Sequence, residues 1–365
     1  MQGEKMKAAV LFEAKTPLSI EEVVVSKPQA REVLIRTHAV GVCRSDLHFV
    51  DGAWPHPAPT VPGHEAAGVV EAVGSDVRHV KPGDHVITFF TAFCGSCEFC
   101  ISGRPSLCID PSTKRPPTSA PRLSLADSTP LAPFLNLSAF AEMMLVHENA
   151  CVAITEDMPL DRAALLGCAV ITGAGSVFND SKVKPGETVA VIGAGGIGLA
   201  AVNAARIAGA GKIIAIDPVP EKRALAEKLG ATHTLDADPD CAKQALALTE
   251  GGVHYAIEAV GRPETAELAW TITRRGGLTT ILGMIAPGKS VSIPGPSFLS
   301  GKRLQGSLLG STQFPIDMPR LCEMYLDGRL DLDTMVAERI ALDQVNHALD
   351  NLRKGDSVRS VIVFE

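Results

Sequence analysis

The hexapeptide GAGGIG, residues 193–198, constrains the fold more than any other part of this sequence. Its glycines Gly193, Gly195 and Gly198 follow the apolar run TVAVI and open the helix-like stretch GIGLAAVNAARIAGA. A second apolar run, KIIAID, ends in Asp217. Glycines at this spacing permit a tight turn, close approach of a ligand to the backbone and close packing of helix on strand. The pattern predicts a parallel α/β sheet that binds a dinucleotide with its pyrophosphate at the helix N-terminus.

The acidic residue Asp217 bears on which dinucleotide is bound. A carboxylate at the end of the second strand accepts hydrogen bonds from the adenosine ribose hydroxyls and repels a 2′-phosphate, which favours NAD over NADP. The alternative is a glycine turn in an unrelated α/β protein, with Asp217 as a helix cap.

Two domains are expected from the length and from a change of pattern near Val170. A chain of 365 residues exceeds what one core usually supports. From Lys7 to about Ala150, short β-type runs are broken by Gly and Pro, whereas strands and helices alternate after Val170 as in a doubly wound sheet. The last segment, SVRSVIVFE, is predicted to be a strand that returns to the first domain. Residues 109–133, rich in Pro and Ser, are predicted to form a long surface loop.

Four closely spaced cysteines indicate a structural metal site: Cys94, Cys97, Cys100 and Cys108. Four thiolates in fifteen residues suit a tetrahedral zinc with no open position. A redox-active CxxC pair is the alternative, but it leaves two of the thiols without a role.

A second set of metal ligands is more widely spaced. Cys43 lies in GVCRSDLH, His64 in VPGHEAAG and Cys168 in LLGCAVITG. Two thiolates and one imidazole leave a fourth position open, as a catalytic zinc requires. Taken singly, each of these residues could equally be a buried core residue.

Charge and hydropathy exclude several classes of partner. The formal charge is −7 and there is no run of Lys or Arg, which argues against nucleic acid and anionic membranes. No apolar run approaches the length of a membrane span, and the N-terminus lacks the apolar core of a signal peptide. Nine cysteines without a secretion signal indicate reduced thiols, so we expect a cytoplasmic protein with a small-molecule ligand.

Over nearly its whole length the sequence resembles the zinc-dependent medium-chain alcohol dehydrogenases. The resemblance is carried by GVCRSDLH, PGHEAAGVVEAVG, the four-cysteine lobe, GCAVITG, GAGGIG and SVRSVIVF. It implies a mainly-β, GroES-like catalytic domain over residues 1–169 and 309–365, with a structural-zinc lobe at about 91–111. It also implies a Rossmann domain, a doubly wound parallel sheet, over residues 170–308.

The resemblance also implies the role of each site residue. Cys43, His64 and Cys168 would bind the catalytic zinc, Glu65 would lie close to it, and Asp46 would hold the imidazole of His64. From the sequence alone, Asp46 could equally cap a turn. Ser45 and His48 would relay the substrate proton to solvent. The implied cofactor contacts are Arg44, Thr172, Gly193, Gly195, Gly196, Ile197, Gly198, Asp217, Lys222 and Arg359.

The activity implied is reversible hydride transfer between a primary alcohol and NAD, with zinc as Lewis acid. The family's pocket positions are apolar here, which favours aromatic or medium-chain alcohols: Trp54, Phe90, Phe134, Leu135 and Met284. One alternative is a dehydrogenase of the thiol adduct of formaldehyde, although Ser112 stands where that class places an arginine, with Lys114 and Arg115 just beyond. A second is an NAD-binding redox sensor without catalysis. The long loop at 109–133 resembles that of dimeric members, so a homodimer is expected.

Overall fold

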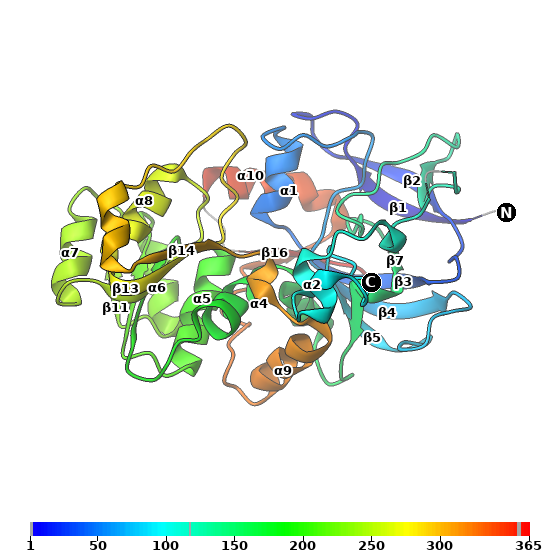
Figure 1. Cartoon of the computed structure of the whole chain (residues 1–365). Helices are drawn as coiled ribbons and strands as arrows, with labels where there is room; N and C mark the ends of the chain where they lie inside the picture. Colours follow the sequence, from blue (N-terminus) through cyan, green and yellow to red (C-terminus); the bar gives the residue numbers. More distant parts are fainter. Residues whose placement is uncertain (1–2, 117, 356–358) are drawn as a thin grey trace. The chain divides into compact units, whose positions relative to one another are not determined.

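The computed structural model describes residues 3–116, 118–355 and 359–365. The chain divides into two compact units (Figure 1). The first comprises Met1–Cys168, Gln313–Leu326 and Val336–Glu365, and the second comprises Ala169–Thr312 and Asp327–Met335.

The first unit is built mainly of antiparallel strands. Within the described residues, one sheet has the order β15-β16-β3-β4-β5-β8, with β7 also paired to β3, and a smaller sheet has the order β1-β2-β6. Apolar, mostly β-branched and aliphatic residues of these strands fill one shared core. The strands are β1 (Glu4–Val10), β2 (Ser19–Val25), β3 (Glu32–Gly41), β4 (Ala66–Val73), β5 (His85–Thr88), β6 (Leu123–Leu125), β7 (Met143–His147), β8 (Cys151–Ala153), β15 (Glu338–Ile340) and β16 (Ser360–Val363).

Short helices border these sheets. They are α1 (Arg44–Val50), α2 (Glu98–Ile101), α3 (Leu160–Ala163), α9 (Phe314–Leu326) and α10 (Val345–Lys354). Helix α9 is attached to the β-structure through Phe314, whose ring stacks on that of Phe89 with centroids 3.9 Å apart. Helix α10 ends at Gly355, which adopts a left-handed conformation with φ of 81°.

The second unit is a parallel sheet with the strand order β11-β10-β9-β12-β13-β14. Numbered within the unit this is 3-2-1-4-5-6, the order of a doubly wound dinucleotide-binding sheet. In Figure 1, α8 lies on one side of the strands, and α5 and α6 lie on the other. The elements are β9 (Thr188–Ile192), β10 (Lys212–Ile216), β11 (His233–Leu235), β12 (Val253–Glu258), β13 (Thr273–Ile281), β14 (Arg303–Gly306), α4 (Ala169–Gly175), α5 (Gly196–Ile207), α6 (Pro220–Leu229), α7 (Cys241–Leu248) and α8 (Pro263–Ile272).

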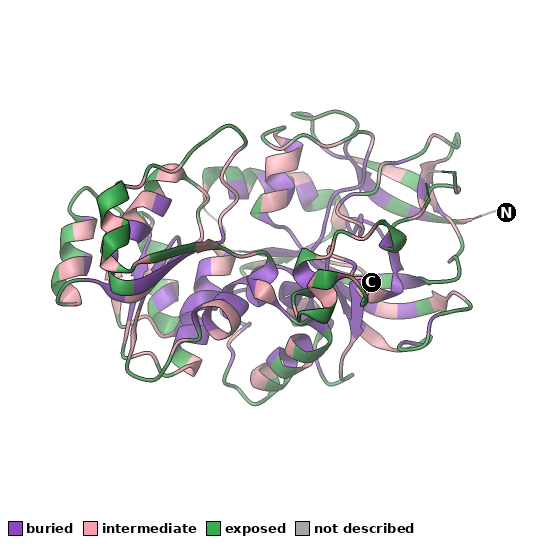
Figure 2. Ribbon diagram, in the orientation of Figure 1, coloured by how far each residue is buried: buried purple, intermediate pink, exposed green. Residues whose placement is uncertain are grey.

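Burial explains why the strands of the second unit read as continuous apolar runs. In β9, β10 and β12 most residues are buried, as the purple ribbon of Figure 2 shows. Helices cover both faces of a parallel sheet, so neither face of a central strand meets water.

The predicted fold class is confirmed, including the return of the last strand. In β16, Val361 pairs antiparallel with Gly41 of β3. One expected boundary differs, because residues 309–365 do not all belong to the first unit: residues 309–312 and Asp327–Met335 belong to the second. The backbone N–H of Asp331 donates to Asn203 of α5 (3.1 Å) and Arg206 donates to the carbonyl of Arg329 (2.7 Å), which ties this segment to α5.

Among the described residues, no single helix is both long and apolar enough to cross a membrane. One bent pair, Leu160–Gly167 with Ala169–Ser181, satisfies the length and composition test.

Candidate active site

The first residue of the candidate site is Cys43, which follows the end of strand β3 by two residues. Cys43 is the N-cap of α1, and its backbone N–H donates to the carboxylate of Asp46 three residues on (3.0 Å). This is the ordinary way in which an acidic residue in the first turn satisfies a free N–H at a helix start. The octet GVCRSDLH is therefore a strand end followed at once by a capped helix, which fixes the position of the Cys43 backbone.

Asp46 also holds the imidazole of His64. Its Oδ1 atom lies 2.7 Å from Nδ1 of His64 and accepts the backbone N–H of Gly63 at 3.2 Å. Asp46 is fully buried, so this carboxylate joins the start of α1 to the segment that carries His64. The Nε2 atom of His64 is buried and has no hydrogen-bond partner among the residues that the structure describes. The imidazole thus presents a free nitrogen, held at a fixed angle, on the side opposite Asp46.

That free nitrogen belongs to a compact group of metal-ligand atoms. The ligand atoms of Cys43, His64 and Cys168 all lie within 4.8 Å of one another, and all three residues are buried. Cys168 follows the 3-10 helix η4 (Ala164–Gly167), whose residues contact β3, β4 and β5. Two sulfurs and one imidazole nitrogen suit zinc, and three protein ligands leave one position for another molecule. These residues would therefore hold a catalytic zinc.

The protonation states of these residues also suit a metal. Hydrogen bonding with the Cys168 thiol lowers the pKa of Cys43 well below its ordinary value, against the effect of burial. Burial lowers the pKa of His64, but Asp46 and the Cys43 thiolate raise it well above its ordinary value. The pocket therefore favours a thiolate beside a positive charge, and a divalent cation replaces that proton when it binds.

Glu65 and Arg359 form a buried pair next to this group. Nε of Arg359 lies 3.5 Å from Oε1 of Glu65, and Nη1 of Arg359 donates to the carbonyl of Val42 (3.0 Å). The carboxylate packs so closely on Gly41 that a Cβ atom there would lie 2.4 Å from Oε1. The structure thus places Arg359 against Glu65 and the Val42 backbone, and its expected contact with the cofactor remains a prediction.

The expected proton-relay residues lie on the same short helix. Oγ of Ser45 lies 3.8 Å from Sγ of Cys43. His48 is partly buried, and burial and the charge of Arg44 lower its pKa, so it is neutral near pH 7. Arg44 donates to the carbonyl of Leu352 (2.9 Å). A neutral imidazole can accept a proton, which is what a relay requires of His48.

Aromatic rings surround the imidazole of His64. The centroids of Phe90 and Phe134 lie 6.0 and 6.3 Å from that of His64. Trp54 is half-buried, and its Nε1 atom is buried without a partner. Leu135 follows Phe134 in a left-handed conformation with φ of 45°. The remaining predicted pocket residue, Met284, lies in the second unit, beside Gly261.

The four clustered cysteines form the second metal-ligand group. Their sulfurs lie within 4.8 Å of one another, with a spacing of 3.5 Å from Cys97 to Cys100, 3.8 Å from Cys97 to Cys108 and 3.9 Å from Cys94 to Cys100. Four sulfurs bound to one zinc at about 2.3 Å stand roughly 3.8 Å apart. The backbone N–H groups of Ser96 and Cys97 donate to Sγ of Cys94 and lower its pKa to about 6. The residues present fit a closed structural zinc site.

The glycine turn of the second unit has the geometry that a dinucleotide needs. Gly193 adopts φ of 93°, and a Cβ on Gly198 would lie 1.7 Å from the carbonyl of Gly193. A Cβ on Gly195, by contrast, would meet no atom within 4 Å, so this side of the turn is open. Gly196 and Ile197 form the first turn of α5, whose N-cap is Gly195. Gly193 and Gly198 are thus required by the backbone conformation and by close packing, whereas Gly195 leaves room for a ligand.

Asp217 lies at the end of β10, as predicted, and is engaged with the turn. Its Oδ2 accepts the N–H of Ala194 (2.8 Å) and its Oδ1 accepts that of Val219 (2.9 Å). Each oxygen retains a lone pair for a further donor. Lys222 is partly exposed, and Thr172 is buried in α4.

Sequence reasoning missed three residues at these sites. Rings of Phe49 and His56 pack against Phe134 with centroids 5.0 and 5.1 Å away, and His56 carries a buried Nε2 without a partner. Only the aromatic character of the stretch HFVDGAWPHP signalled this cluster. Arg223 donates to the carbonyl of Asp217 (2.6 Å), whereas the sequence singled out its neighbour Lys222.

Two family models match the chain. Residues 29–156 match the alcohol dehydrogenase GroES-like domain, and residues 196–326 match the zinc-binding dehydrogenase domain.

Solved structures match over almost the full chain. An alcohol dehydrogenase zinc-binding domain protein from Burkholderia ambifaria is 35% identical with a TM-score of 0.95, covering 99% of each chain. Benzyl alcohol dehydrogenase from Acinetobacter calcoaceticus is 31% identical with a TM-score of 0.93, covering 99% of this chain and 100% of its own. A zinc-binding dehydrogenase from Sinorhizobium meliloti 1021, bound to NADP, is 29% identical with a TM-score of 0.82 and covers the same shares.

Proposed function

Because the chain belongs to the zinc-dependent medium-chain alcohol dehydrogenase family, we propose that it oxidises primary alcohols to aldehydes, reversibly, with NAD as hydride acceptor. The oxidoreductase class follows from the family. The alcohol, the cofactor and the individual residue roles are the proposal. The observation that carries it is the buried group of Cys43, His64 and Cys168, which offers three ligands and leaves a fourth position open.

The bound groups supply the central chemistry: zinc acts as a Lewis acid toward the substrate oxygen and NAD takes up hydride. The protein positions and deprotonates the substrate. Asp46 fixes the imidazole of His64 through Nδ1, so that Nε2 faces the metal position. Oγ of Ser45, beside Cys43, takes the substrate proton while giving up its own, which would reach neutral His48 through the nicotinamide ribose when NAD is bound, and His48 passes a proton to solvent. The rings of Phe90 and Phe134 exclude water around this point.

An aromatic alcohol fits these surroundings best. The rings near His64 give apolar surface and leave no partners for the hydroxyls of a polyol. The likeness to benzyl alcohol dehydrogenase points to the same class. The thiol-adduct alternative needs a free cation for a carboxylate. Here Arg115 makes five hydrogen bonds to its own chain, so its guanidinium is already engaged, which leaves the exposed Lys114 as the cation of this loop that could serve the adduct.

NAD is proposed over NADP because a buried carboxylate, Asp217, ends β10 beside the glycine turn. A 2′-phosphate placed there would meet this negative charge. The NADP complex of the Sinorhizobium meliloti protein makes this choice a direct experimental question. Asp217→Gly should weaken NAD binding and improve use of NADP. An unchanged ratio of the two cofactors would refute the assignment.

Two zinc ions per chain, a homodimer and a cytoplasmic location complete the proposal. The zinc ions are assigned to the two groups of metal-ligand residues. All nine cysteines are free, as expected of a chain kept in a reducing compartment. Metal analysis distinguishes the enzyme from an NAD-binding sensor, since the sensor needs no metal at Cys43. Sedimentation analysis tests the dimer.

The decisive experiment is a panel of alcohols and aldehydes assayed with NAD and with NADP. Benzyl alcohol and a medium-chain alcohol should be oxidised with NAD, and a polyol should not. Formaldehyde is included with and without glutathione. Activity only with the thiol present would favour the adduct enzyme, and no activity with any alcohol would overturn the proposal.

A matched pair of variants tests the relay. Ser45→Ala should lower kcat by roughly 10²-fold, because the substrate proton loses its acceptor, while binding of NAD stays unchanged. Ser75→Ala, in a loop of the same unit, is the control. Equal losses of turnover and cofactor affinity in Ser45→Ala would count against a relay.

A further inference from the structure

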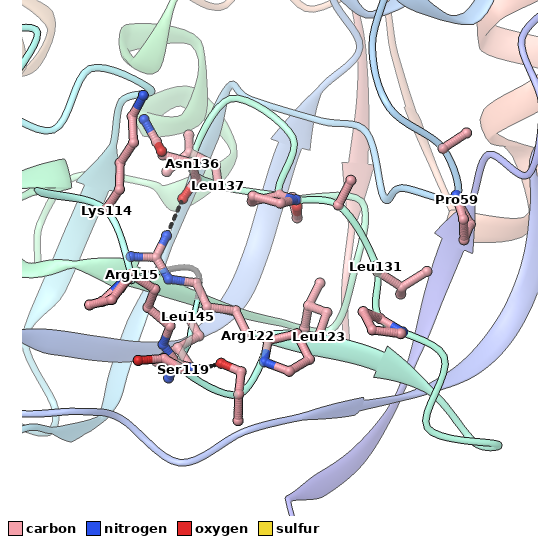
Figure 3. Close-up of a pocket in the computed structure, with 18 residues that line it drawn as sticks. Pro59, Lys114, Arg115, Ser119, Arg122, Leu123, Leu131, Asn136, Leu137 and Leu145 are labelled. Atoms are coloured by element: carbon pink, nitrogen blue, oxygen red, sulfur yellow. Dashed lines mark hydrogen bonds between the residues drawn. The ribbon is translucent and has the colours of Figure 1, made fainter. Parts of the chain in front are cut away.

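A second cavity lies in the first unit and is lined by none of the residues assigned to zinc or substrate (Figure 3). Its volume is about 550 Å³. Pockets for small molecules span about 300 to 1,000 Å³, so the cavity is large enough for such a ligand. Its walls come from residues 58–59, 114–116, 119–123 and 130–133, together with residues 136–138 and Leu145.

One end of the cavity is apolar and the other is polar. In Figure 3, Leu131 and Pro59 are labelled toward one end of the cavity, and Lys114 and Asn136 toward the other. Prolines and alanines contribute most of the remaining lining. A ligand complementary to this cavity has a hydrocarbon body and one polar terminus.

Two guanidinium groups next to the cavity share a single carboxylate. Glu32 is buried; its Oε1 accepts Nε of Arg115 and Nε of Arg122, each at 2.9 Å, and its Oε2 accepts Nη2 of Arg115 at 2.6 Å. Arg115 uses its other N–H groups on Ser26 and on the carbonyls of Lys27 and Ala120. Its guanidinium is therefore structural.

Arg122 and Lys114 are not satisfied in this way. Nη1 of Arg122 makes a long bond of 3.3 Å to the carbonyl of Asn136, and its Nη2 makes no hydrogen bond to any described residue. Lys114 is exposed and pairs with no acidic side chain in the described chain. Both cations line the cavity, and both have N–H donors to spare.

The local charges do not balance. Burial raises the pKa of Glu32, but Arg115 and Arg122 lower it below its ordinary value, so Glu32 carries one negative charge. Against it stand three positive charges, those of Arg115, Arg122 and Lys114. Burial lowers the pKa of Arg122, Glu32 raises it through its charge and its hydrogen bond, and the charge of Arg115 lowers it again, so that the net direction is downward. An anion placed at this end would relieve that excess.

We propose that this cavity is a second binding site, which takes a small carboxylate with an aryl or alkyl body. The carboxylate accepts hydrogen bonds from Nη2 of Arg122 and from Lys114. The hydrocarbon body lies among the leucines and prolines at the other end. The inference does not depend on the proposed alcohol oxidation, because the two sites share no residue.

Calorimetric titration of the zinc-loaded full chain tests the site, with 4-phenylbutyrate as ligand and the neutral 4-phenylbutanamide as its matched control. The carboxylate should bind, and the amide should bind at least roughly tenfold more weakly, since charge-assisted bonds are lost. Lys114→Ala should weaken binding of 4-phenylbutyrate by roughly three- to tenfold. Lys243→Ala, an exposed lysine on α7, is the control and should change nothing.

A variant that fills the cavity tests whether the ligand binds there or at another site. Ser119→Trp places a large ring in the cavity wall and should abolish binding of 4-phenylbutyrate, with thermal unfolding followed to verify the fold. Should that variant not fold, Lys114→Ala decides alone. No binding, equal affinity for the amide, or binding that both cavity variants leave unchanged would each overturn the proposal, the last because it locates the ligand at another site.

Discussion

Replacing Asp46 by asparagine tests how the candidate zinc site is held together. The side chain is fully buried and accepts three hydrogen bonds, from Nδ1 of His64, the N–H of Gly63 and the N–H of Cys43. An amide retains one acceptor oxygen. Its best orientation keeps the bonds to His64 and Gly63 and turns the NH2 group toward the Cys43 N–H. One buried donor then faces another, at a cost of about 2 kcal/mol of unfolding free energy.

The effect on metal binding should be larger than the effect on stability. Loss of the carboxylate removes the charge that orients the imidazole and makes it a stronger ligand, which typically lowers metal affinity roughly 10- to 100-fold. Competition with a chelator, followed by counting of the zinc ions retained, measures this for each site. Asp46→Asn should release one zinc early and keep the one at the four clustered cysteines. Asp84→Asn, whose amide oxygen can still accept the exposed Lys81 N–H, is the control.

Unfolding in urea supplies the second readout for Asp46→Asn. Full retention of both zinc ions at the wild-type chelator concentration, together with unchanged stability, would refute the view that this carboxylate joins the two ligand-bearing segments.

Three further predictions concern stability. Burial, aided by the charge of Arg31, lowers the pKa of His147 to about 4, so the folded state disfavours protonation of this side chain. Neutral His147 therefore adds to the free energy of unfolding. That added stability is complete above about pH 6.5 and is lost as the pH falls toward 4. His147→Asn keeps an acceptor for the N–H of Asn149 but cannot be protonated. Between pH 7 and pH 5 its free energy of unfolding, measured by urea titration, should therefore fall by about 2 kcal/mol less than that of the wild type. An equal fall in both proteins would contradict this. Phe314→Ala removes the ring stacked on Phe89 and should cost about 3 to 4 kcal/mol in the same assay; a cost below about 1 kcal/mol would show that α9 is held by other contacts. Cys97→Ser should leave one zinc per chain by mass analysis and lower the melting temperature, and retention of two would contradict the assignment of the lobe.

Much of the fold was predictable because local pattern and tertiary context agree. The glycines of GAGGIG and the buried runs TVAVI and KIIAID have few alternatives to a parallel α/β unit. Strands β2 and β14 were not predicted. Strand β2 (SIEEVVV) has two adjacent glutamates in its middle and is largely accessible to solvent, and β14 is an exposed four-residue edge strand, so neither carries a strong apolar signal.

The ligand sets were predictable from residue type, but their supports were not. Thiols and imidazoles are rare enough to be recognised without a structure, and the geometry brings all seven into two groups. The pairing of Arg359 with Glu65, and the packing of His56 on Phe134, depend on segments far apart in sequence. Nothing local in either segment specifies the partner. The cavity at Lys114 has the same origin, since its walls come from six separate stretches.

The pairing of β16 with β3 has a consequence for biosynthesis. Gly41 of β3 finds its partner Val361 only when the segment Ser360–Val363, more than 300 residues later in the sequence, has left the ribosome. By then the whole parallel sheet of the second unit has already been made. Until that moment the end of β3, next to Cys43, is an open edge, and the Glu65 carboxylate lacks the guanidinium of Arg359. Nascent chains should therefore pass through a stage in which the α/β unit is folded but β16 has not yet paired with β3 beside the zinc-ligand segments. It is at this stage that chaperones should protect the nascent chain.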